Sequence, residues 1–140
     1  LAMQQLGWCL EPVTAEIFDF LDHRRTKSAD VIIANLVLHH FSDDALRALF
    51  ARSQHRAKAI AACEPRRGFA ALTAARLVSI IGCNEVTQHD AVASVRAGFR
   101  DKEVSALFPV SAEWDLRECA AIPFTHCFAA RRAARHDPGP

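Results

Sequence analysis

The stretch Asp30–Phe50, DVIIANLVLHHFSDDALRALF, contains the strongest structural signals of the chain. Its first part, Asp30–Leu38, is a nearly continuous aliphatic run, which is typical of a central strand covered on both faces in a parallel sheet. Ser42 then caps a helix whose first turn is acidic and whose apolar residues recur at helical spacing. A buried strand followed by an amphipathic helix predicts an α/β layer structure.

The rest of the chain continues this alternation of strand and helix patterns. We predict two further strands, Pro12–Phe18 and Lys58–Glu64, and a closing antiparallel hairpin of Glu113–Ala121 and Phe124–Ala130. Three further helices are predicted: one from Gly68 to Gly82, one capped by Thr87 and Asp90 that ends at Gly98, and a short one over Asp101–Phe108. We expect one domain over residues 1–130 and a flexible tail over 131–140, where apolar periodicity stops.

The composition excludes several classes of protein. With 51% hydrophobic residues, the chain of 140 residues can build a core. Its net charge of +1 gives no strong positive electrostatic field, which argues against nucleic acid or a membrane surface as its partner. Its five cysteines contain no CxxC, which argues against a disulfide framework or a zinc knuckle and favours a reducing cytoplasm. Cys63, inside AIAACE, is interpreted as a small core residue.

Three segments carry a resemblance to a known family. Asp30–Phe50 resembles the central strand, following loop and helix of the S-adenosylmethionine-dependent methyltransferases with a Rossmann-like fold. ACEPRRG at Ala62–Gly68 resembles the end of the next strand, and QHDAVASVRAGF at Gln88–Phe99 resembles the substrate-side insert of small-molecule methyltransferases. The resemblance covers nearly the whole chain as the C-terminal two-thirds of the family domain. It implies methyl transfer from S-adenosylmethionine to a small phenolic or enolic hydroxyl.

The chain departs from this family in its glycines. Such enzymes begin with a strand, a GxGxG-type turn and a second strand ending in an acid that holds the cofactor ribose, whereas the five glycines here never form a GxG pair. In the family strand order 3-2-1-4-5-7-6, loss of the first two strands exposes one edge of Asp30–Leu38. We therefore expect an incomplete Rossmann-like sheet, weak cofactor binding, and self-association or a partner that completes the sheet. A non-catalytic remnant that acts as an interaction module is the alternative function.

The resemblance also implies cofactor contacts. Glu16 and Ile17 would lie beside the adenine ring, as an acidic acceptor for its amine and an apolar wall. Asn35 and Leu36 would contact the cofactor at the carboxyl end of their strand, where open α/β sheets place ligands. The alternatives are a surface Glu, a core Ile and a local backbone hydrogen bond from Asn35.

Histidines supply the implied catalytic and substrate groups. His39 is the first His of a segment similar to the H-x-[WF]-S-D segment of plant-type O-methyltransferases, and an imidazole suits removal of the hydroxyl proton. His40 is the neighbouring candidate, although either His also fits a structural role at the strand end. The resemblance implies that His89 and Arg96 on the insert contact the substrate. Their presence is explained equally well if His89 marks the start of a helix and Arg96 is a solvated side chain on it. No third ligand has useful spacing, so we expect no metal.

Overall fold

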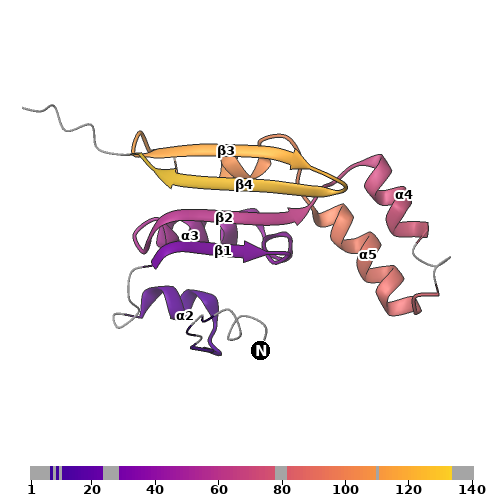
Figure 1. Ribbon diagram of the computed structural model, residues 1–140, viewed down its shortest axis with the longest axis horizontal. Helices are drawn as coiled ribbons and strands as arrows, with labels where there is room; N and C mark the ends of the chain where they lie inside the picture. Colours follow the sequence, from indigo (N-terminus) through magenta and orange to yellow (C-terminus); the bar gives the residue numbers. More distant parts are fainter. Residues whose placement is uncertain are drawn as a thin grey trace, which may run out of the picture.

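The computed structural model describes residues 7, 9, 11–23, 29–77, 82–109 and 111–133. These residues form an α/β fold around one four-stranded mixed sheet in the order β1-β2-β4-β3 (Figure 1). The strands are β1 (Ala29–Asn35), β2 (Ala57–Pro65), β3 (Trp114–Ala121) and β4 (Thr125–Arg132). β1 and β2 are parallel, and β4 is antiparallel to both of its neighbours. The predicted α/β class, the predicted strand Lys58–Glu64 and the predicted closing hairpin are confirmed.

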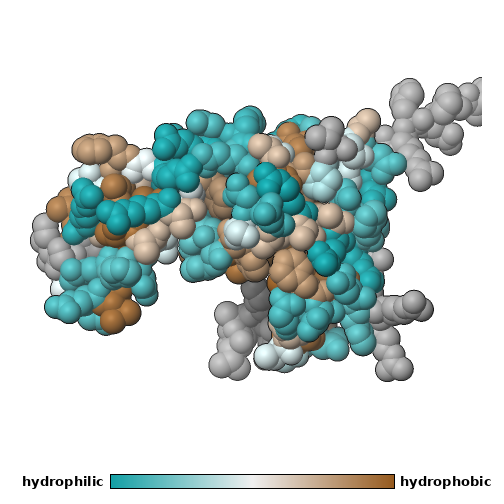
Figure 2. Space-filling model, turned by 180° about the vertical axis from the view of Figure 1, so that it is seen from behind, coloured by the Kyte–Doolittle hydropathy of each residue, from teal (hydrophilic) through white to brown (hydrophobic). Residues whose placement is uncertain are grey.

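Helices cover one face of the sheet and extend from one end. They are α2 (Ile17–Asp22), α3 (Asp43–Ser53), α4 (Phe69–Leu77), α5 (Glu85–Ala97) and α6 (Glu103–Leu107), with a 3-10 turn η1 (Leu38–His40) after β1. In Figure 1, α3 lies behind the sheet, and α4 and α5 pack on each other to one side. Figure 2 shows this pair from behind as a projection with hydrophobic patches. Phe69 of α4 and Val86 of α5 are exposed. None of the described helices is long and apolar enough to cross a membrane.

The hydrophobic core lies between α3 and the sheet. Ser42 caps α3 as predicted, since its Oγ accepts a hydrogen bond of 3.3 Å from the backbone N–H of Ala45. The apolar stripe of α3 then faces the strands, and the ring of Phe50 lies 5.6 Å from that of Phe128 on β4 and 5.4 Å from that of Phe108. The helical spacing of the apolar residues therefore determines which side of α3 is buried.

The opposite face of the sheet is open in the described part of the chain. The register places Val31 and Ile33 of β1 in line with Ala59 and Ala61 of β2 on this face. Val31 is 50% exposed and Ile33 is 76% exposed. Among the strands of the described residues, β1 is the outermost on its side of the sheet, as the prediction of an edge position requires. The prediction of a strand covered on both faces is wrong for these residues, because the described helices pack on the other face.

Two predictions for the N-terminal half of the chain are also wrong, one of an element type and one of a strand end. Pro12–Phe18 is not a strand, because the Glu16 side chain accepts hydrogen bonds from the N–H groups of Phe18 (2.8 Å) and Asp19 (3.0 Å) and thereby starts α2. β1 ends at Asn35 instead of Leu38, because Leu36 takes a left-handed conformation with φ of 54° and turns the chain.

Differences also occur around α5 and in the C-terminal region. α5 starts earlier than predicted, since Asn84 accepts a hydrogen bond of 2.8 Å from the N–H of Thr87 and takes the capping position assigned to Thr87 itself. β4 continues to Arg132, two residues into the predicted tail, and the rest of that tail from residue 134 lies outside the described residues. Residues 78–81, before the predicted helix end at Gly82, also lie outside them.

Gly98 ends α5 as predicted and has a packing role. A Cβ at Gly98 would lie 2.2 Å from the carbonyl oxygen of Pro65, so only glycine permits this approach of the two backbones. Beside it, the N–H of Phe99 donates to the Pro65 carbonyl (3.0 Å) and the N–H of Arg67 donates to the Phe99 carbonyl (2.9 Å). These contacts attach the end of α5 to the carboxyl end of β2, where the candidate site lies.

Candidate functional site

Glu64 organises the carboxyl end of the parallel pair β1–β2. Its side chain is buried, with 1% exposure. Oε1 accepts hydrogen bonds of 2.9 Å from the N–H groups of Val37 and Leu38, and Oε2 accepts a longer one of 3.4 Å from the N–H of His39. These donors belong to the turn after β1, where no preceding helical carbonyl pairs with them. One carboxylate therefore fixes the backbone of the whole turn.

The same carboxylate orients the His39 ring. His39 Nδ1 lies 2.7 Å from Glu64 Oε2, and the His39 side chain is only 4% exposed. A carboxylate only accepts hydrogen bonds, so Nδ1 carries the proton and a neutral ring has its lone pair on Nε2. Nε2 is buried and has no hydrogen-bond partner among the described residues. The orientation leaves the proton-accepting nitrogen of the ring without a partner, as a histidine base needs, although His39 itself does not line the cleft that Phe41 and Phe99 line.

A cleft of about 390 Å³ opens between the start of α3, the end of α5 and α6. Phe41, two residues after His39, and Phe99 supply aromatic walls. Two arginines, Arg47 and Arg67, also line the cleft, and Arg67 forms an ion pair with the lining residue Glu103. The cleft therefore offers both aromatic surface and cationic groups close to the turn that carries His39.

A second hollow of about 200 Å³ is almost entirely apolar and lies between α2, β1 and α3. Ile17 of α2 and Val37 of the turn line it. Phe41 lines both this hollow and the cleft, so the chain segment after His39 separates two concave regions of different polarity.

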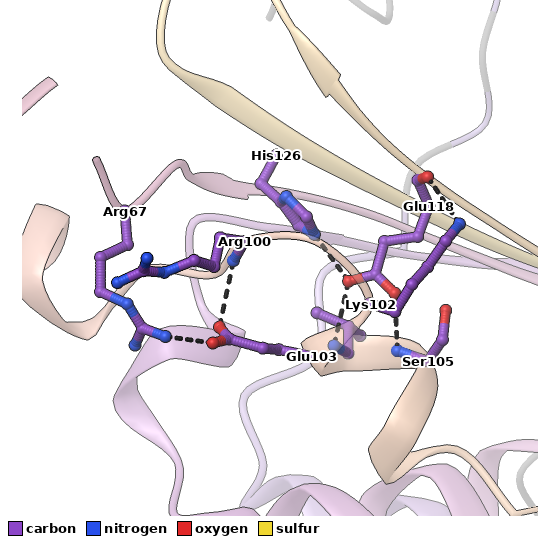
Figure 3. A network of polar contacts seen from close by, with 8 residues as sticks. Arg67, Arg100, Lys102, Glu103, Ser105, Glu118 and His126 are labelled. Atoms are coloured by element: carbon purple, nitrogen blue, oxygen red, sulfur yellow. Dashed lines mark hydrogen bonds and ion pairs between the residues drawn. The ribbon is translucent and has the colours of Figure 1, made fainter. Parts of the chain in front are cut away.

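A second buried carboxylate, Glu118 of β3, lies beyond β4 from Glu64, and Figure 3 shows its contacts. Glu118 accepts hydrogen bonds from the N–H groups of Val104 (3.0 Å) and Ser105 (2.8 Å), which fixes the start of α6. His126 Nε2 lies 2.6 Å from Glu118 Oε1, and both side chains are buried. His126 is the register partner of Glu64, so the two Glu–His pairs lie side by side on the covered face of the sheet.

The hydrogen bonds of Glu118 lower its pKa. Burial opposes this shift by favouring the neutral acid, but the hydrogen bonds from Ser105, His126 and the Val104 backbone hold the pKa of Glu118 below its ordinary value of 4.5. The carboxylate form of Glu118 is thus part of the folded state.

The structure brings only some of the predicted site residues together. His39 lies in the buried site, and His40 is exposed with its ring 4.1 Å from the His39 ring. Asn35 and Leu36 are exposed at the end of β1. The Glu16 carboxylate caps α2 at the N-terminal side of the apolar hollow, which Ile17 lines.

The two predicted substrate contacts lie on α5 away from the buried pair. His89 and Arg96 are both exposed. His89 Nδ1 lies 3.8 Å from the carboxylate of its sequence neighbour Asp90. Neither residue lines the cleft.

Glu64, Glu118 and His126 are not among the predicted site residues, although each occupies an inward-facing position in the alternating pattern of its strand. Glu118 follows Trp114 and Leu116 at alternate positions, and His126 lies between Phe124 and Phe128 in the same way. Glu64 likewise follows Ile60 and Ala62. A polar residue at an inward-facing strand position requires a buried partner, so such positions mark candidate networks.

Comparisons with known proteins do not assign this site. No protein-family model and no curated protein matches the chain. Among the described residues, no group of three or more His, Cys, Asp or Glu side chains is arranged to hold a metal ion. The function is therefore argued from the geometry of the site.

The lowered pKa of Glu118 predicts a pH-dependent contribution to stability. Because the pKa is lower in the folded than in the unfolded state, the stabilisation is present above the ordinary value of 4.5 and is lost as pH falls through the lowered folded pKa. We expect the wild-type chain to lose more free energy of unfolding than Glu118→Gln between about pH 7 and about pH 3. Urea unfolding at both pH values measures this, with exposed Glu113→Gln as the matched control. An equal loss in the wild type and E118Q would contradict the prediction.

Proposed function

We propose that this chain is the C-terminal part of a Rossmann-like S-adenosylmethionine-dependent methyltransferase domain that methylates a small phenolic or enolic hydroxyl, with His39 as the general base. The Glu64–His39 pair carries the proposal. Glu64 holds the proton on Nδ1 at 2.7 Å and leaves Nε2 without a partner among the described residues. The pair lies at the carboxyl ends of parallel strands, where α/β sheets bind ligands.

The strand order supports the family assignment. If β1, β2, β3 and β4 correspond to the fourth, fifth, sixth and seventh strands of the family, the observed order β1-β2-β4-β3 reads 4-5-7-6. This is the second half of the order 3-2-1-4-5-7-6. The placement of the last strand between its two predecessors is the unusual feature that the two orders share.

The residues present fit the cofactor in part. The apolar hollow beside β1, lined by Ile17 and Val37, suits one face of an adenine ring. The Glu16 carboxylate, however, is engaged by the first N–H groups of α2, and the chain contains no GxG turn. These residues alone therefore support only weak binding of S-adenosylmethionine, and Asn35 and Leu36 remain proposed contacts at the strand end.

The proposed chemistry is a direct displacement. S-adenosylmethionine, when bound, supplies the methyl group. His39 Nε2 accepts the hydroxyl proton as the acceptor oxygen attacks, and the Glu64 carboxylate stabilises the positive charge that forms on the ring. Both side chains are buried, so the acceptor hydroxyl reaches Nε2 only when the turn that carries His39 moves toward the neighbouring cleft.

The neighbouring cleft is the proposed acceptor site. Phe41 and Phe99 can stack on a planar phenol or enol. Arg47 and Arg67 lie at the same cleft as donors, although they are already paired with Asp44 and Glu103. His89 and Arg96 remain proposed contacts on the exposed side of α5 for a larger acceptor.

We predict that His39→Ala slows methyl transfer by about 10² to 10⁴, the usual effect of losing a general base, and leaves cofactor affinity nearly unchanged. The measurement is the single-turnover rate with labelled S-adenosylmethionine and a panel of phenols and enols, in a longer chain in which a glycine-rich cofactor segment precedes these residues. His55→Ala is the matched control, because His55 is exposed and lies just after the end of α3, away from the Glu64–His39 pair. Unchanged rates in H39A would refute the role of His39.

An interaction module is the second candidate function, and the position of β1 favours it. An edge strand presents unpaired backbone groups, and on β1 the adjacent side chains Val31 and Ile33 are exposed and apolar. Such an edge can add a strand from a second copy or from another protein.

We predict concentration-dependent self-association of the chain under reducing conditions, measured by light scattering. Ile33→Lys should reduce it, because a charge on the edge strand opposes strand addition. Leu77→Lys is the matched control, since Leu77 is also an exposed aliphatic residue but lies on α4. A monodisperse wild-type monomer with strongly protected amides along 30–38 would argue against this function.

A further inference from the structure

Three cysteines form a row on the open face of the sheet. The register pairs Cys63 of β2 with Cys127 of β4, and Cys127 with Cys119 of β3. Directly opposed residues of antiparallel strands project to the same face, so the three thiols are neighbours across the strands. Cys63 and Cys119 are exposed, and Cys127 is half-buried between them. The interpretation of Cys63 as a core residue is therefore wrong, because Ile60, Ala62 and Glu64 of β2 are buried on the covered face and Cys63 is exposed on the other.

The geometry of Cys63 and Cys127 suits a reversible bond. Their Sγ atoms are 3.9 Å apart. Opposed residues of antiparallel strands have Cα atoms about 4.5 to 5.5 Å apart, within the range of about 4.4 to 6.8 Å that disulfides span. Directly opposed residues have Cβ atoms about 4.5 to 5.5 Å apart, slightly more than the about 3.5 to 4.5 Å of a disulfide, so side-chain rotation together with a small approach of the two strands brings the sulfur atoms into bonding distance.

We propose that Cys63 and Cys127 form a dithiol site that low-molecular-weight disulfides oxidise to an intramolecular disulfide. The Cys63 thiolate attacks one sulfur of the small disulfide, so a mixed disulfide forms and one small thiol leaves with the proton lost by Cys63. Cys127 then attacks the Cys63 sulfur, which forms the protein disulfide and releases the second small thiol. Two electrons pass from the two cysteines to the small disulfide.

The surroundings assign the order of these steps. Burial, together with the adjacent Cys63 and Cys119 thiols, raises the pKa of Cys127. Cys127 is therefore the resolving thiol, and the exposed Cys63 meets the oxidant first. Cys119 lies on the other side of Cys127, so its thiol can replace Cys63 as the disulfide partner of Cys127. Cys63 directly precedes Glu64, so the bond forms on the reverse side of the strand that supports His39.

The test is oxidation of the folded 140-residue chain with oxidised glutathione, followed by alkylation and peptide mapping without reduction. Trypsin leaves Cys63 in the peptide 59–66 and both Cys119 and Cys127 in the peptide 118–131. We expect these two peptides to be cross-linked, while Cys9 and Cys83 remain outside the cross-link.

Single replacements identify the partner. The cross-link should persist in Cys119→Ser and disappear in Cys127→Ser, and in Cys63→Ser the bond should move to a loop between Cys119 and Cys127 within 118–131. Recovery of Cys63 and Cys127 in alkylated form while exposed Cys9 is glutathionylated would overturn the proposal, as would the same mixture of pairs in folded and urea-unfolded chains. A cross-link that survives in C127S would assign the bond to Cys119 and also overturn it.

Discussion

The Glu64 carboxylate is the contact on which the candidate site depends. Burying a charged group is unfavourable unless hydrogen bonds compensate for the lost water, and Glu64 is 1% exposed. The turn after β1 supplies this compensation through the N–H groups of Val37 and Leu38, and His39 adds its ring N–H. The same bonds set the shape of the turn, the tautomer of His39 and the start of the segment that leads into α3.

The two faces of β2 divide the chemistry of the molecule. Glu64 faces the core beside its register partner His126, which is hydrogen-bonded to Glu118. Cys63 faces the opposite way, where its register partner is Cys127. The alternation of strand side chains thus places an acid–base pair on the covered face and a dithiol on the open face of the same strand end.

Local patterns predicted the parts of the fold that depend on local interactions. Ser42 marks the start of α3, and Lys58–Glu64 and the final hairpin have the length and alternation of strands. The segment Pro12–Phe18 is not a strand, because the capping hydrogen bonds that Glu16 accepts from Phe18 and Asp19 outweigh the β-branched composition. His39 was found as a candidate base from a resemblance. Its partner Glu64 was missed, because their contact joins residues 25 positions apart.

The protonation state of the His39 ring tests the central claim most directly, and long-range ¹H–¹⁵N NMR spectra report it. We predict that the neutral ring carries its proton on Nδ1 in the wild type. The same result is expected in the control Glu118→Gln, because Glu118 contacts His126 and not His39. In Glu64→Gln, this preference should be lost, because the carboxylate that accepts the Nδ1 proton is gone. A wild-type ring protonated on Nε2, or an unchanged Nδ1 preference in E64Q, would contradict the claim that Glu64 prepares His39 as a base.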